Sequence, residues 1–290
     1  STVTNTVNSQ NVSVGFGNNS KVKAWRNVSA RAKSKLDLYS RVQDSGYGLG
    51  TNCSATAANT VTRNVSATVG NGAAITAVVG NIEILSEGDE DSSIESIAKG
   101  SSGAAYAGGG PSANITYTSN VTTTVGGGSD IEAKYGTLDI RSKEAMTMYA
   151  YAYRKASAAV ASNKSTAKIT ATTNVSTKIA ENTTEKARLL GEYTTIGAYI
   201  VLQKIHANAI SYTASAGSKT EAVATSNVNN TLNTKIDNAY VGGIETLTVA
   251  ASVDNQNIKS ESYAEVVGFT GKVYATSEIS GSNTVNITVT

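Results

Sequence analysis

The chain repeats itself at an interval of about 54 residues, and a fixed period of this kind limits the folds available to it. The first marker is an Asn-Val pair that recurs along the sequence, with an asparagine alone at the sixth position: Asn11, Asn64, Asn120, Asn174, Asn227 and Asn283. The interval between successive markers is nearly constant. A second marker, about 17 residues downstream, keeps the same interval at Val28, Ile82, Leu138, Tyr193 and Leu247. Two independent markers with one period predict a repeat architecture.

We therefore expect one continuous repeat domain over residues 1–290, with units at approximately 11–63, 64–119, 120–173, 174–226 and 227–282. A unit of about 54 residues is long for a single solenoid turn. The spacing of about 17 residues between the two markers favours three turns of about 18 residues per unit, and two turns of about 27 remain an alternative. Sixteen short turns stacked about 4.8 Å apart would form a rod roughly 75 Å long.

Composition indicates strands packed around a narrow core. The chain is 40% hydrophobic, but alanine, valine and isoleucine dominate and there are only two phenylalanines. Residues 64–84 alternate small or β-branched side chains with polar ones, and 120–140 repeat that pattern, which is typical of strands. One proline and 26 glycines suit strands joined by tight corners. The sequence predicts an all-β fold, a parallel β-helix or β-solenoid.

Two local features qualify this pattern. We expect the repeat-marker asparagines Asn11, Asn64, Asn120, Asn174, Asn227 and Asn283 to lie at corners, because asparagine tolerates left-handed backbone and its amide can bond nearby backbone groups. Residues 181–205 break the alternation. Good helix formers within them predict an irregular insertion with one or two helical turns.

Several function classes are disfavoured. A net charge of +2 gives no electrostatic case for nucleic acid binding. The sequence contains no run of 18 apolar residues, so we expect no membrane-spanning helix. The lone Cys53 cannot form an intramolecular disulfide. No signal peptide is recognised, and strand-like sequence at both ends suggests a mature product or a segment of a longer repetitive protein.

Candidate sites are few. Tyr149, Tyr151 and Tyr153 alternate, so they line one face of a strand, where they would form a contact face for glycan or protein or stack across strands. The acidic stretch 87–91 resembles a calcium loop only loosely, and we expect a solvated loop with no metal and no cofactor. The single histidine, His206, and Cys53 are expected to be structural. With carboxylates scattered along the sequence, we expect no catalytic residues and no enzymatic activity.

Asn-x-Ser/Thr sequons accompany the repeat. Glycosylation candidates are Asn11, Asn27, Asn64, Asn120 and Asn174, although Asn-Val-Ser/Thr is also simply the repeat motif.

The pattern of 64–84, Asn-Val-x-Ala-x-Val-Gly-x-Gly-Ala-x-Ile-x-Ala-x-x-Gly-Asn-Ile-x-Ile, resembles the repeats of giant secreted bacterial adhesins of the filamentous-haemagglutinin type. The resemblance covers nearly the whole chain and is weakest at 181–205. It implies a right-handed parallel β-helix in an extracellular fibre or stalk at the cell surface. The sequence contains no counterpart of the amino-terminal secretion domain of that family.

Three functions follow as hypotheses. The first is a non-enzymatic structural or adhesive solenoid that associates end to end into a filament, because capping turns are not recognisable and open strand edges can template another copy. The alternative is an adhesin module that binds glycans or host cells. The remote alternative is a polysaccharide-active enzyme on a β-helix.

Overall fold

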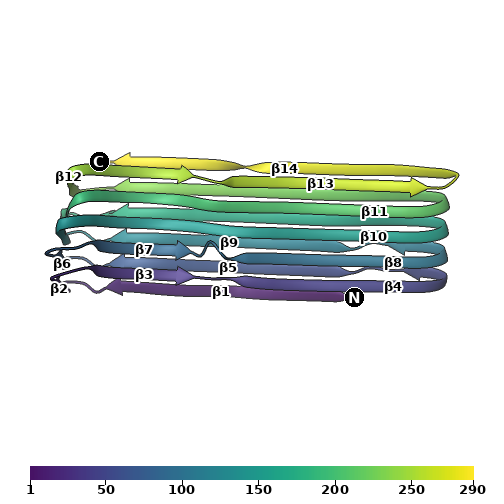
Figure 1. The fold of residues 1–290 in the computed structure, drawn as a ribbon, viewed down its shortest axis with the longest axis horizontal. Coiled ribbons are helices and arrows are strands. Elements are labelled where there is room, and N and C mark those ends of the chain that lie inside the picture. The colour runs from purple at the N-terminus through teal and green to yellow at the C-terminus, as the bar shows by residue number, and fades with distance from the viewer.

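The structure, a computed structural model, describes residues 1–290 and consists of strands and turns without any helix. All fourteen strands belong to one parallel sheet that curls back on itself (Figure 1). Their bounds are β1 (Thr2–Phe16), β2 (Lys21–Ala24), β3 (Val28–Ser34), β4 (Asp37–Asn52), β5 (Thr56–Val69), β6 (Ala74–Ala77), β7 (Ile82–Gly88), β8 (Ser93–Gly109), β9 (Ser112–Val125), β10 (Asp130–Ile179), β11 (Ala187–Ile236), β12 (Ala239–Val253), β13 (Gln256–Val267) and β14 (Thr270–Val289). The prediction of an all-β, parallel architecture is confirmed.

The register shows how the sequence repeat becomes structure. Thr56 pairs with Thr2 of the preceding repeat and with Ser112 of the following one. Later in the chain Ile179 pairs in the same way with Ile236. Each strand residue therefore lies beside one in the next sequence repeat, and the chain makes one circuit per repeat. Three predicted markers are displaced from their columns, because Leu138 pairs with Thr194 instead of Tyr193, and Thr231 and Thr284, not Asn227 and Asn283, continue the column of Asn174. The expectation of three short turns per unit is wrong.

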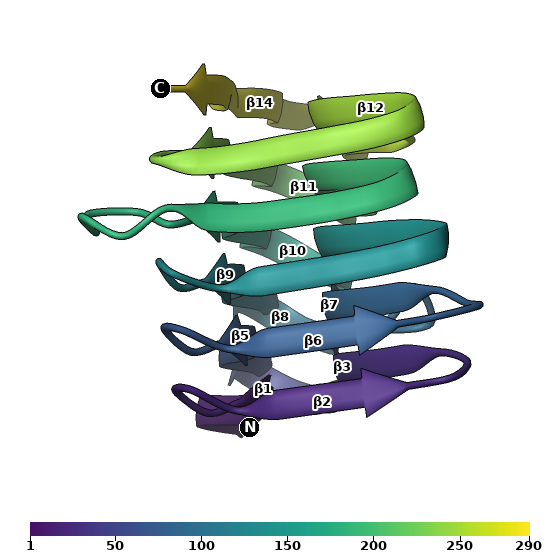
Figure 2. The same ribbon diagram turned by 90° about the vertical axis from the view of Figure 1, so that its left-hand side faces the viewer.

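The circuit has a long straight side because β5 and β9 each continue over 14 residues without a glycine or proline to bend them. β9, for example, alternates buried and less buried side chains over 14 residues. Each circuit consists of two long walls, in which the chain runs in opposite directions, and a narrow end that joins them (Figures 1 and 2). The first wall contains β1, β5, β9, the whole of β14 and the equivalents of β14 in β10 and β11, which end at Ile179 and Ile236 (Figure 1). The narrow end begins with β2 and β6. The second wall contains β3, β7, β13, most of β4 and β8, and their equivalents in β10, β11 and β12; β4 and β8 turn the far corner into the first wall before they end.

This geometry explains the spacing of the two sequence markers. Asn64 lies on the first wall in β5, whereas Ile82 begins β7 on the second wall. The two markers of each unit thus belong to different walls of the same circuit. With strands about 4.8 Å apart, the six strands of the first wall span about 25 Å, far less than the roughly 75 Å expected from short turns.

The core between the two walls is narrow and made of small side chains. A cluster of 23 buried residues fills one half, and clusters of 19 and 7 residues fill the other. Alanine, valine and isoleucine dominate all three. Because equivalent positions stack directly above each other, a large side chain in every circuit would exceed the space that neighbouring circuits leave.

The corners of the circuit are not formed by the repeat-marker asparagines that the sequence predicted. Left-handed backbone occurs at Asn19, Gly72 and Gly128, which occupy the turn between the first wall and the narrow end in successive circuits. The repeat-marker asparagines Asn11, Asn64, Asn120 and Asn174 instead lie within strands, on the outer face of the first wall. Asn227 and Asn283 also lie within strands, in β11 and β14. The corner prediction is wrong for all six.

The irregular insertion predicted at 181–205 is much shorter in the structure. Turns and bends occupy only 180–186, where Asn182 has left-handed backbone. From Ala187 the chain re-enters the sheet as β11, and no helical turn forms. Pairing with β10 and β12 supplies a ladder of backbone hydrogen bonds along this segment, which overrides the helix propensity of residues 185–189.

Candidate interaction surfaces

The predicted tyrosine row lies on the outer face of the second wall. Tyr149, Tyr151 and Tyr153 project from β10, with successive ring centroids 6.0 and 6.3 Å apart and nearly parallel planes. The row extends beyond β10, because the ring of Tyr212 of β11 lies 5.8 Å from that of Tyr153 and the ring of Tyr263 of β13 lies 5.4 Å from that of Tyr212. We call this set of five tyrosines the tyrosine line. Sequence alternation identified its first three members, and its last two become neighbours only through the register.

A groove of about 650 Å³ lies along one end of the tyrosine line. Tyr151, Tyr153 and Tyr212 line it together with Ile210, and one basic and one acidic side chain, Lys155 and Glu265, also reach it. Burial is the largest cause that raises the pKa of the Tyr149 and Tyr151 phenols above the ordinary value, so both stay neutral donors at physiological pH. The groove therefore combines aromatic surface with hydroxyl donors and balanced charge.

His206 lies at the other end of the tyrosine line, with its ring 5.4 Å from the ring of Tyr149. Its Nε2 lies 2.8 Å from an Oε of Glu261 on β13. The register pairs His206 with Lys259, and Glu261 lies two positions further along β13 on the same face, so the contact is diagonal across the two strands. On this outer face the Glu261 side chain is exposed and that of His206 is half-buried.

The acidic stretch 87–91 and Cys53 have structural surroundings. The carboxylate of Glu87 pairs with Arg31 and Lys33 of the preceding circuit, and Asp89 also pairs with Lys33. Arg31 and Lys33 of the first unit therefore neutralise Glu87 and Asp89. Glu87 is buried within β7, so the expected solvated loop is wrong for that residue, and only 89–91 form a partly exposed turn. Cys53 is buried beside the corner at the end of β4.

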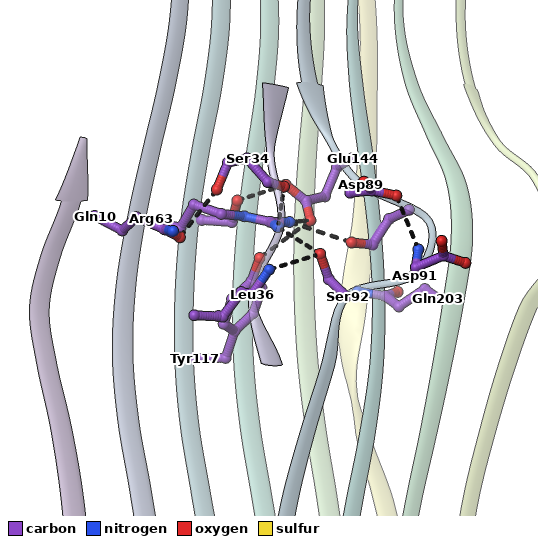
Figure 3. Close-up of polar contacts among 12 residues, drawn as sticks. Gln10, Ser34, Leu36, Arg63, Asp89, Asp91, Ser92, Tyr117, Glu144 and Gln203 are labelled. Atoms are coloured by element: carbon purple, nitrogen blue, oxygen red, sulfur yellow. Dashed lines mark hydrogen bonds and ion pairs between the residues drawn. The ribbon is translucent and has the colours of Figure 1, made fainter. Parts of the chain in front are cut away.

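Buried polar side chains also cross the interior, where they meet between the two walls (Figure 3). Arg63 of the first wall forms an ion pair with Glu144 of the second, and both side chains are at most 2% exposed. Ser119 and Tyr117 donate to the same carboxylate over 2.5 and 3.1 Å. In the following circuits the amides of Gln203 and Asn230 bond each other. We call this interior band the polar seam.

The Arg63–Glu144 group contains residue types that catalysis uses, but its setting is structural. Protein surrounds it on all sides, so a substrate cannot reach it without opening the sheet. Removing one partner of such a buried pair costs about 3–5 kcal/mol, because the other charge is left uncompensated. The pair therefore fixes which positions of the two walls face each other.

Asparagines form a second repeated feature, on the outer face of the first wall. Asn64 donates to Asn11, Asn120 donates to Asn64, and Asn174 donates to Asn120, over 2.8–2.9 Å. We call these four residues the asparagine ladder. Asn227 and Asn283 lie outside it, because Thr231 occupies the next ladder position and Asn283 bonds Asn230 of the seam instead. Asn27 is exposed at the narrow end, and its side chain accepts from the backbone of Asn81.

The ladder predicts an unequal effect for two neighbouring substitutions. Asn120→Ala removes two ladder hydrogen bonds, so we expect the free energy of unfolding to fall by about 1–2 kcal/mol. Thr122→Ala, two positions along the same strand, removes none and should change stability little. Urea unfolding followed by circular dichroism measures both, and equal losses in the two variants would contradict a stabilising ladder.

The polar seam predicts a pH dependence of stability. Burial, and next the charge of Glu144, raise the pKa of Tyr117 well above its ordinary value. Because the folded state holds this phenol neutral, its contribution is complete below the unfolded pKa of about 10 and is lost as pH rises above it. In Tyr117→Phe the loss of stability between about pH 10 and 12 should be smaller than in the parent chain. Parallel losses, measured by urea unfolding at each pH, would show that another group titrates.

The structure contains no apolar helix of the length that a membrane crossing requires. Comparison of the chain with protein-family models, curated proteins and solved structures found no match in any of the three.

Proposed function

We propose that the chain is a non-enzymatic subunit of an extracellular structural or adhesive fibre, built as a right-handed parallel β-solenoid. The observation that carries this proposal is the pair of unpaired edges of the sheet. β1 has β5 as its only strand neighbour, and 276–289 of β14 has only β11. The Ser/Thr/Asn-rich surface, the sequons and the resemblance to secreted adhesin repeats support an extracellular location.

The edge at β14 is apolar where a further strand would cover it. Val285, Ile287 and Val289 face the interior but are 45–63% exposed, whereas Val65 and Val69 in the same columns are 1% exposed. Apolar side chains beside free backbone donors and acceptors favour addition of another strand. A second copy of the chain supplies a strand of the matching pattern.

The columns of the sheet specify the pairing. Following the register from β1 through the stack to β14 places Val12, Val14 and Phe16 in the columns of Val285, Ile287 and Val289. When β1 of one copy pairs with β14 of another, these apolar side chains continue the core. The first wall has six strands and the second has five, so each junction leaves one strand position of the second wall open. The axial repeat is then six strand spacings, about 29 Å.

The test uses residues 1–290. We expect concentration-dependent fibres in the electron microscope, with a strand spacing of about 4.8 Å and an axial repeat of about 29 Å. Val285→Lys places a charge in the interface core and should abolish fibres. Thr284→Lys, the adjacent outward position, should leave them intact. A chain that sediments as a monomer at high concentration contradicts the proposal.

A second candidate function is glycan binding by the tyrosine line, favoured by the groove and its balanced charge. Aromatic rings with hydroxyl groups combine apolar contact with hydrogen bonding, which suits a neutral saccharide. In the variant with Tyr149, Tyr151 and Tyr153 all replaced by alanine, binding to a glycan array or to cells should be lost. Tyr135→Ala, at an exposed tyrosine near the narrow end, is the control. Unchanged binding in the triple variant excludes this surface.

A further inference from the structure

The outer face of the first wall carries a regular lattice of hydroxyl groups. The sequence Thr-x-Thr occurs at 60–62, 116–118 and 170–172, and the register pairs these three segments directly. Six threonines therefore stand in two adjacent columns over three successive strands. Neighbouring hydroxyls lie about 4.8 Å apart across the strands and about 6.8 Å apart along them.

The threonine hydroxyls on this face are free to bind an external partner. Side-chain hydrogen bonds beside them run along the asparagine ladder, between Asn64 and Asn120 and between Asn120 and Asn174. This pattern leaves the six threonines of the two columns without a side-chain partner in the protein. Their positions are nevertheless fixed, because each belongs to a strand that is paired on both sides.

The face is also flat and carries few charges. Its strands lie side by side with little twist (Figure 1). The first three strands of the wall are 2–16, 56–69 and 112–125. Their only charged side chain is that of Arg63, which points into the polar seam. In the fourth strand Lys164, Lys168 and Lys178 lie outside the two threonine columns. The opposite face differs, because the second wall presents tyrosine, lysine and glutamate side chains of unequal length.

We propose that the outer face of the first wall binds the surface of ice. A flat crystalline partner matches a rigid, repeating array better than an irregular macromolecule does. Hexagonal ice repeats its surface oxygens along two perpendicular directions at intervals close to the two threonine spacings. Each threonine supplies one hydroxyl for a lattice water and one methyl group, and no strongly hydrated charge stands within the two columns. Because the hydroxyls are already ordered, little conformational entropy is lost on binding.

The experiment measures ice growth in a solution of residues 1–290 cooled slightly below the freezing point. We expect faceted crystals and thermal hysteresis, and retention of the fluorescently labelled chain on a growing ice surface. Thr118→Tyr places a large ring in the middle strand of the array and should reduce the hysteresis about tenfold, as disruption at the centre of a contact surface does. Thr147→Tyr, an outward threonine on the second wall, is the matched control and should retain full activity.

Circular dichroism and thermal unfolding establish that both variants are folded. Absence of hysteresis and of ice retention in the parent chain overturns the proposal. Equal loss in the two tyrosine variants does so as well, because the effect would not depend on the threonine array. A flat polar sheet could instead pack face to face against a second copy of the chain, and sedimentation detects the dimer that this would form. A dimer that Thr118→Tyr dissociates, without ice activity, assigns the face to that contact and overturns ice binding.

Discussion

In-register pairing of each circuit with the next is the interaction on which the rest of the structure depends. Backbone hydrogen bonds place every residue beside its equivalent one repeat away, so any property of a position is repeated up the stack. A column that is apolar becomes part of the core, and a column of asparagines becomes a ladder. A single circuit cannot pair its own backbone groups into a sheet, so the fold is stabilised only by the contacts between neighbouring circuits. Sequence similarity between repeats therefore translates directly into packing.

Register must be fixed because a shift of one residue would turn the core outward. Between registers that differ by two residues, a core of alanine, valine and isoleucine alone discriminates weakly, since such shifted pairings of small side chains fill space nearly as well. The polar seam adds discrimination. Arg63, Glu144, Gln203 and Asn230 satisfy each other only when the two walls face each other at one alignment. The asparagine ladder acts similarly on the outer face, where each amide needs its equivalent directly above.

The same columns give the two walls different surfaces. Long aromatic and charged side chains gather on the second wall and make an irregular groove that suits a small or flexible ligand. Short hydroxyl and amide side chains occupy the first wall and make a flat array that suits an ordered surface. The two faces point in opposite directions and share no residues, so a fibre of such units can carry two contacts independently. In the proposed fibre, the open edges at β1 and β14 would form a third contact along the stack axis.

The sequence by itself determined the period, the strand character and the small-residue core, because all three follow from which residue types recur and how often. It also placed Tyr149, Tyr151 and Tyr153 on one face, since alternation along a strand requires no knowledge of its neighbours. Only the tertiary structure decided the length of a circuit. A period gives the distance between equivalent residues but does not show where the chain bends between them.

The bends depend on left-handed positions such as Asn19, Gly72 and Gly128, which composition does not distinguish from the many other asparagines and glycines. For the same reason the corner prediction for the repeat-marker asparagines failed. Their equivalence was correct for Asn11, Asn64, Asn120 and Asn174, but Asn227 and Asn283 lie in other columns. Pairs such as Asn64 with Asn120 were implicit in the period once the register was known. Arg63 and Glu144 were not, because they belong to opposite walls and meet only when the circuit closes around the core. Contacts along a column are thus readable from sequence, whereas contacts across the core require the fold.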